Sequence, residues 1–221
     1  MEFQKNTVSK QDIGQTQEQE KEVSLSPEKK QEIIKAVVNG KINLKNCNEL
    51  IKDDRDINFS CVKCGCGLID ISPSFKNDRE IVLEAVKHSG GWNLERASKK
   101  LKNDREIVME AVKNECYSLK FASPELQNDK EIVLEAIKSY SFVLKYASPQ
   151  LKNDREFILE AMKINGEVLQ YISPELRNDK EFIAECFFIN PPKRMKDVFG
   201  YNKEEFIANF KKNLEEGRIY Y

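Results

Sequence analysis

Apolar and polar positions follow a helical period in a block that recurs along most of the chain. After an Asn-Asp pair and two charged residues, apolar side chains cover about 200° of a helical wheel. In the first strong copy these are Ile81, Val82, Leu83, Ala85 and Val86. A helix lying on one core needs only about 100° of apolar surface, so each of these helices is expected to lie between two neighbours. Glu84 and Lys87 share the remaining face and can pair.

The copies follow one another at a nearly constant spacing, which predicts a repeat protein. The Asn-Asp pairs begin 25 or 26 residues apart, at Asn77, Asn103, Asn128, Asn153 and Asn178. Weaker copies of the helical block start at Gln31, Arg55 and Glu204, which gives eight in all. A Glu three residues after each Asn predicts a capping box in which Asn is the N-cap.

The second half of each unit predicts a shorter helix followed by a turn. A leucine column stands ten residues before the next unit's Asp, at Leu44, Leu68, Leu94, Leu119, Leu144 and Leu169. Ser-Pro then follows at Ser72, Ser123, Ser148 and Ser173. Because proline disfavours helix in the residue before it, we expect a helix of six or seven residues that ends there. Serine then caps one further turn, whose leucine points inward at Leu101, Leu126, Leu151 and Leu176.

These patterns predict an all-α fold, an α-solenoid of about eight short helical hairpins with a 24–26-residue period. Tetratricopeptide and ankyrin periods are longer, and the strand signature of leucine-rich repeats does not occur. Residues 1–25 are polar and are predicted to be disordered. The array is expected over 26–215, with strong repeats at 77–190, degenerate capping repeats at 26–76 and 191–215, and a tail at 216–221.

The order of cap, apolar arc, leucine column and Ser-Pro turn resembles a family of helical repeats named as domain of unknown function four-one-one-six. The resemblance covers roughly residues 50–190, and one family domain spans about two of these units. That family is seen in bacteria that live inside host cells, including secreted effectors, and in protists. The resemblance implies no catalytic residues.

Composition excludes several functions. Lys and Arg (36) nearly balance Asp and Glu (37), which argues against a nucleic-acid partner. No stretch reaches the ~20 apolar residues of a membrane span, and the first residues show no secretory signal. The six cysteines are therefore interpreted as reduced thiols. We expect a monomeric protein of the cytoplasm, or of the host cytosol if it is a secreted effector.

Cysteines supply one candidate site. Cys61 and Cys64 form a C-x-x-C pair, and Cys66 and Cys47 lie nearby, so four thiolates could hold zinc or form a redox pair. The alternative is packing, because Cys47, Cys61 and Cys186 take positions that small core residues occupy in other units. The repeat offers no such explanation for Cys64 and Cys66.

Aromatic residues supply the other candidate, a possible partner-binding strip. Two columns near the second helix contain Trp92, Tyr117, Phe121, Phe142, Tyr146 and Tyr171. Members four residues apart would share a helix face and form a ridge across units. Such a ridge could bind a partner or could pack adjacent units together. The single histidine, His88, is at a helix C-terminus, where interaction with the helix dipole explains it without catalysis.

We therefore expect a non-enzymatic protein–protein interaction module or scaffold without a cofactor, whose partner is an unidentified protein. The variable turns at 88–93, 114–118, 139–143 and 164–168 are expected to determine specificity. The alternative is a small zinc-binding or thiol-redox sensor built on the cysteines around Cys61.

Overall fold

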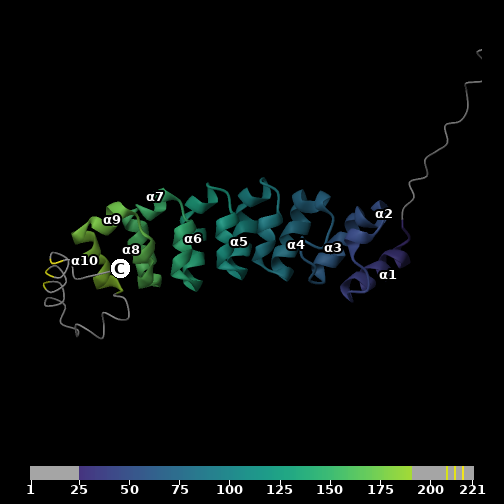
Figure 1. Cartoon of the computed structure of the whole chain (residues 1–221), viewed down its shortest axis with the longest axis horizontal. Helices are drawn as coiled ribbons and strands as arrows, with labels where there is room; N and C mark the ends of the chain where they lie inside the picture. The colour runs from purple at the N-terminus through teal and green to yellow at the C-terminus, as the bar shows by residue number, and fades with distance from the viewer. Residues whose placement is uncertain (1–24, 191–207, 209–211, 213–215, 217–221) are drawn as a thin grey trace, which may run out of the picture.

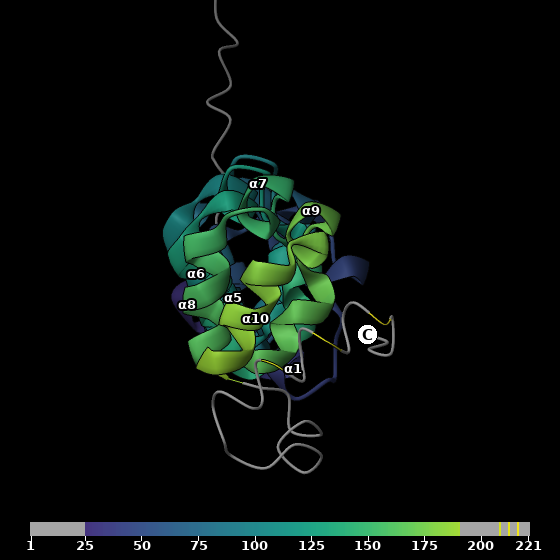
Figure 2. The same ribbon diagram turned by 90° about the vertical axis from the view of Figure 1, so that its left-hand side faces the viewer.

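A computed structural model describes residues 25–190 and the single residues 208, 212 and 216. Its helices lie side by side in one elongated row (Figure 1). Seven of the described helices correspond to the first helix of a unit: α1 (Pro27–Val38), α3 (Arg55–Lys63), α4 (Arg79–Ser89), α5 (Arg105–Asn114), α6 (Lys130–Ser139), α8 (Arg155–Ile164) and α10 (Lys180–Ile189). The solenoid predicted from the repeat is confirmed, and viewed along the row the units lie one behind another (Figure 2).

The predicted short second helix is present in most described units, and its geometry is that of a 3₁₀ helix, six residues long in four of them. These segments are η1 (Leu44–Asn46), η3 (Gly91–Arg96), η5 (Cys116–Phe121), η7 (Ser141–Tyr146) and η8 (Gly166–Tyr171). In a 3₁₀ helix residues three apart lie on one face. Leu119 and Ala122 are three apart and both are buried, and so are the corresponding pairs of the other units except the first, where Cys47 is half-buried.

A short turn of helix closes each unit. The turns are α2 (Glu49–Lys52), η2 (Pro73–Asn77), η4 (Leu101–Asn103), η6 (Leu126–Asn128), α7 (Pro149–Lys152) and α9 (Pro174–Asn178). Serine caps them as predicted, except that Asn48 caps α2: Ser148 Oγ accepts the Leu151 N–H at 3.1 Å, and Ser173 Oγ accepts the Leu176 N–H at 3.2 Å. The inward leucines of these turns are buried.

The long helices are capped by Asp rather than by the Asn before it. Asp104 Oδ1 accepts the N–H groups of Glu106 and Ile107 at 3.1 and 3.2 Å, and Asp78, Asp129, Asp154 and Asp179 cap their helices in the same way. The expected capping box is therefore wrong by one residue. The Asn has another role, because Asn77 Oδ1 accepts the hydroxyl of Ser98 from the next turn at 2.8 Å. The same bond recurs from Ser123 to Asn103, Ser148 to Asn128 and Ser173 to Asn153.

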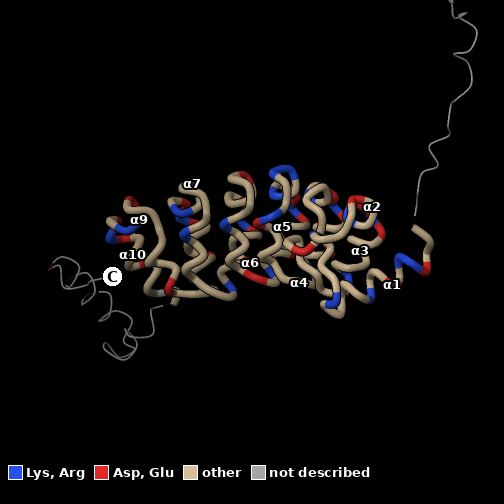
Figure 3. Tube along the Cα trace, turned by 45° about the vertical axis from the view of Figure 1, so that its right-hand side comes forward, with Lys and Arg blue, Asp and Glu red and all other residues tan. Residues whose placement is uncertain are grey.

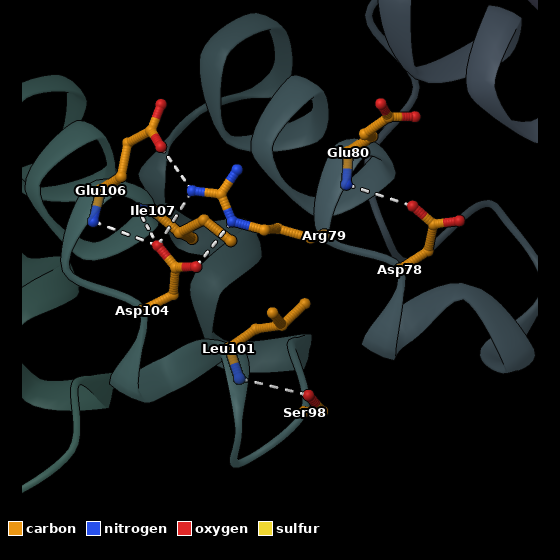
Figure 4. Close-up of polar contacts among 8 residues, drawn as sticks. All are labelled: Asp78, Arg79, Glu80, Ser98, Leu101, Asp104, Glu106 and Ile107. Carbon is orange, nitrogen blue, oxygen red and sulfur yellow. Dashed lines mark hydrogen bonds and ion pairs between the residues drawn. The ribbon is translucent and has the colours of Figure 1, made fainter.

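Charged side chains link each long helix to the next. Arg79 donates to Asp104 at 2.7 Å and to Glu106, both in the following unit (Figure 4). Arg55 binds Asp78 and Glu80 in the same way, Arg105 binds Asp129 and Glu131, Lys130 binds Asp154, and Arg155 binds Asp179. We call this series the charge ladder. It accounts for the basic residue that directly follows the Asp caps of α3, α4, α5, α6 and α8.

One apolar core runs the length of the described array. It contains the entire leucine column and the five arc residues predicted for α4. Glu84 and Lys87 pair on the outer face at 3.6 Å. The N-terminal units diverge from the pattern: α1 begins at Pro27 behind a Ser26 cap, four residues before the Gln31 copy. The polar segment 1–24 and the copy at Glu204 lie outside the described residues.

No helix within the described ranges is long and apolar enough to cross a membrane. Neither is any β-strand present in that part of the chain.

Candidate functional site

Aromatic side chains from three successive units form a continuous cluster, which we call the aromatic surface. Ring contacts join five of its members, Trp92, Tyr117, Phe121, Tyr140 and Phe142, and the sixth, Tyr146, shares Lys145 with Phe142. Trp92 stacks on Tyr117 with ring centroids 6.1 Å apart, and Phe121 meets the Trp92 ring edge-on at 5.9 Å. Tyr117 in turn contacts Phe142 at 4.6 Å. These contacts join one unit to the next, so the predicted packing between units is present.

The cluster is also open to solvent, as a binding strip requires. Tyr140 is 56% exposed and Trp92 is 45% exposed, while the other four members are half-buried. Exposed aromatic clusters of this kind typically mark interaction sites. The two interpretations of the ridge are therefore compatible, because one edge of the rings packs and another faces water.

The 3₁₀ geometry changes how the rings are arranged. Residues four apart in η5 do not share a face, and Phe121 contacts Trp92 of the preceding unit instead of forming a ridge with Tyr117. Tyr171 lies one unit beyond Tyr146 and lines a separate shallow hollow together with Pro149 and Pro174. Among the described residues, no ring contact joins Tyr171 to the aromatic surface.

Tyr140 is a member that the sequence reasoning missed. It is the C-cap of α6, a position taken by Glu115 after α5 and by Asn165 after α8, so the column shows no aromatic pattern. Its ring lies 5.8 Å from Phe142 and 6.2 Å from Tyr117. The one feature of the sequence that points to Tyr140 is its position within the variable turn 139–143.

Two lysines lie over the rings. Lys120 Nζ is 4.9 Å from the Trp92 centroid and 4.5 Å from that of Phe121. Lys145 Nζ is 5.2 Å from the Phe142 centroid and 4.8 Å from that of Tyr146. An ammonium over an aromatic face is attracted by the ring quadrupole. The aromatic surface is therefore cationic as well as apolar.

The rest of the array mixes both signs of charge along its length (Figure 3). The charge ladder is internally neutralised, since each basic residue in it contacts at least one carboxylate. Its acids repeat in every unit, which is typical of a structural element and not of a local active site.

The four cysteines of the candidate metal site do not come together as one metal-binding group. Cys47 is half-buried at the end of η1, and its thiol points toward the Asn43 carbonyl oxygen at 3.6 Å. Cys61 is fully buried in α3, whereas Cys64 is exposed at its C-cap. Among the described residues, no group of three or more His, Cys, Asp or Glu side chains could hold a metal ion.

Cys66 has a packing explanation that the sequence reasoning lacked. Its N–H donates to the Cys61 carbonyl at 3.1 Å, and the Gly65 N–H donates to Val62 at 3.0 Å. This pair of bonds is a Schellman motif, which ends a helix with a glycine at positive φ, here +97° at Gly65. Such motifs bring the two flanking side chains together, and Cys66 packs against the core beside Cys61. Burial, followed by the neighbouring Cys66 and Cys64, raises the pKa of Cys61 to about 12.

The remaining cysteines fit the packing alternative to different degrees. Cys186 is fully buried, as a substitute for core alanine should be, and Cys116 is almost fully buried at the start of η5. Cys47 is only half-buried, so it fits its small-residue column less well. His88 lies on the surface with Nε2 3.4 Å from Glu84 Oε2 on its own helix.

Comparisons with known proteins give one match. No curated protein and no solved structure matches the chain. The family described as "Domain of unknown function (DUF4116)" matches four times in tandem, over residues 59–102, 78–127, 104–152 and 154–206. Each match spans about two units, and together they cover most of the array. The chain therefore belongs to the DUF4116 family of tandem helical repeats.

Proposed function

We propose that the chain is a non-enzymatic scaffold that binds a partner protein through the aromatic surface. The observation that carries this proposal is the exposure of an aromatic cluster contributed by three successive units. Trp and Tyr are enriched at the centres of protein interfaces, where they combine a large apolar area with a polar tip. A rigid array that already packs these rings would lose little entropy on binding.

The position of the surface within the units supports the same proposal. Trp92, Tyr117 and Phe142 lie in three of the four turns whose sequences vary most between copies. Variation within a repeat is typical of a binding face, because the conserved columns are needed for stacking. Neighbouring units can thus differ in specificity while they share one core.

The test uses Trp92→Ala combined with Tyr140→Ala as the binding variant. Its control is Leu50→Ala combined with Ile69→Ala, which truncates two other exposed apolar side chains, 41% and 47% exposed, outside the aromatic surface and outside the four variable turns. Full-length wild type and both variants are used as bait in lysate of the source cell, with capture read by mass spectrometry. Circular dichroism checks that all three have the same helix content.

We expect a reproducible set of proteins that wild type and the control variant capture and the binding variant loses. Capture of the same set by all three folded baits would contradict the proposal.

A further inference from the structure

Lys120 and Lys145 hold equivalent positions in adjacent units, each directly after its column leucine. Each ammonium lies over two rings of the aromatic surface. Within the described part of the chain, neither forms an ion pair with a carboxylate. By contrast, the Arg79 guanidinium contacts two carboxylates. Two cations on the aromatic surface are therefore free to meet anionic groups of a partner.

The spacing of the two lysines restricts the shape of that partner. Adjacent units of a helical stack lie about 8–10 Å apart. A polyproline II helix rises about 3.1 Å per residue with three residues per turn, so side chains at i and i+3 point the same way about 9.3 Å apart. In a β-strand, residues three apart point to opposite faces. An extended polyproline II chain can thus place carboxylates on both lysines.

The rings between the lysines suit the rest of such a chain. Proline-rich segments are recognised by aromatic side chains, and their stiffness lowers the entropy lost on binding. Trp92, Tyr117 and Phe142 supply one ring from each of three units in a continuous row. The shallow hollows found elsewhere, near Gly40 and near Pro174, have no such row of rings.

We propose that the aromatic surface binds an acidic, proline-containing segment in the polyproline II conformation. Carboxylates three residues apart pair with Lys120 and Lys145, and the intervening prolines contact Trp92, Tyr117 and Phe142. This inference rests on the proposed function and specifies the chemical class of the partner segment.

One acid of this protein opposes such a ligand. Glu115 is the C-cap of α5 and precedes the central ring, that of Tyr117, by two residues; burial, Cys116, Tyr140 and then Glu115 raise the pKa of the Tyr117 phenol. The charge of Glu115 repels an acidic peptide. Glu115→Gln is therefore expected to tighten binding about twofold to threefold.

The probe is a fluorescein-labelled peptide of about four Glu-Pro-Pro triplets, titrated with the full-length chain and followed by anisotropy. Matched peptides replace Glu with Gln or with Lys, and a helical Glu-Ala-Ala peptide keeps the charge but not the conformation. Lys120→Glu with Lys145→Glu is compared with Lys113→Glu with Lys163→Glu. The control pair makes the same charge change at two exposed lysines outside the aromatic surface.

We expect Kd for the Glu-Pro-Pro peptide to be at least about tenfold lower than for any other peptide. The Lys120/Lys145 variant should weaken it by at least about tenfold, and the Lys113/Lys163 variant by less than about twofold. No binding at about 1 mM, equal binding of the Gln or helical peptide, or equal loss in both charge variants would overturn the proposal.

The two proposals fail in different ways. If the Trp92/Tyr140 variant loses its cellular partners but no Glu-Pro-Pro peptide binds, the surface is an interface and its ligand has another chemistry. If capture from lysate is unaffected by that variant, the proposed function itself is wrong.

Discussion

Arg79 Nε lies 2.7 Å from Asp104 Oδ2, across the boundary between two units. The other oxygen of Asp104 accepts the N–H groups of Glu106 and Ile107 and so caps α5. One carboxylate therefore starts a helix and links it to the preceding helix. The arrangement recurs along the charge ladder, which ties helix capping to stacking throughout the array.

Substitutions at Asp104 separate these two roles. Asp104→Ala removes both the cap and the ion pair and should lower the free energy of unfolding by about 1–2 kcal/mol. Asp104→Asn keeps a good cap and loses only a partly exposed ion pair, so its loss should be a few tenths of a kcal/mol. Urea unfolding of the two variants measures the difference. Equal losses would show that the ion pair, and not the cap, dominates.

Acid should destabilise the array through the ladder carboxylates. Partial burial disfavours the ionised form of Asp104, but the interactions with Arg79 and with the capping N–H groups outweigh this effect, so the pKa of Asp104 is lowered. The pKa values of Asp78 and Asp129 are lowered for the same reasons, with Arg55 and Arg105 as the basic partners. Since the folded pKa lies below the unfolded value of about 3.9, this stabilisation is complete above that value and is lost as pH falls through the folded pKa. Thermal unfolding should show a constant Tm from about pH 5 to 7 and a decrease below about pH 4.

The control for this acid effect is the triple variant Asp78→Asn, Asp104→Asn, Asp129→Asn. Its Tm should be lower at neutral pH but should change less between pH 5 and pH 3. An equally steep acid decrease in the triple variant would assign the effect to other carboxylates.

Ala111 tests the phase of the helical wheel. It is fully buried in α5, whereas the adjacent Glu110 is partly exposed. Ala111→Asp places an unpaired charge in the core and should cost several kcal/mol, enough to unfold much of the array. Glu110→Gln should change the free energy of unfolding by less than about 0.5 kcal/mol. Circular dichroism melting curves that coincide for the two variants would contradict the observed packing.

Asn58 is a polar residue at a position that is apolar in the other units. Its equivalents, such as Val82 and Val108, are aliphatic, yet Asn58 is fully buried. Its amide donates to the Lys52 and Asp54 carbonyls at 2.9 and 2.8 Å and accepts the Ser72 N–H at 3.1 Å. In the next unit the corresponding serine N–H, that of Ser98, bonds directly to the Lys76 carbonyl. The Asn58 side chain thus bridges two backbone groups that bond directly elsewhere.

Asn58→Val should therefore destabilise the N-terminal units although it restores the pattern of the repeat. The buried backbone groups lose their partner, at a cost of about 1–3 kcal/mol. Ser60→Ala, at a half-buried position of the same helix, is the control. Hydrogen exchange should show faster exchange at Ser72 in the valine variant alone. Unchanged protection there would mean that the direct backbone bond forms once the amide is removed.

The repeat in the sequence was sufficient to predict the solenoid, because the apolar arc and the leucine column depend only on side-chain polarity and spacing. Finer features depend on geometry that the pattern does not specify. Asn77 and Asp78 are both good caps, and only the fold shows how they divide their roles: Asp78 caps α4 and binds Arg55, whereas Asn77 accepts the Ser98 hydroxyl. A six-residue stretch such as 116–121 is compatible with α or 3₁₀ geometry, and this choice sets the contacts of Phe121. Tyr140 does not belong to a column of aromatic residues in the repeat, so only the folded structure shows that its ring lies in the aromatic surface.

The cysteines provide the last prediction, because their packing and zinc-binding interpretations give different results. Zinc binds thiolates, and burial raises the pKa of Cys61 to about 12, which opposes thiolate formation. Cys61 and Cys66 instead lie together at the Schellman end of α3. Cys47→Ala with Cys61→Ala should then change the free energy of unfolding by no more than about 1–2 kcal/mol, and a chelator should have no effect on Tm.

Metal analysis of the purified protein decides between the two interpretations. Packing predicts zinc well below one equivalent per chain in both wild type and the double alanine variant. Cys64→Ala is the matched control, because this thiol is exposed and should contribute little to stability. The packing interpretation would be contradicted if the purified wild type kept one equivalent of zinc and if both the double alanine variant and Cys64→Ala lost it. Those three thiols would then have to rearrange around a metal, and the N-terminal units would depend on it for folding.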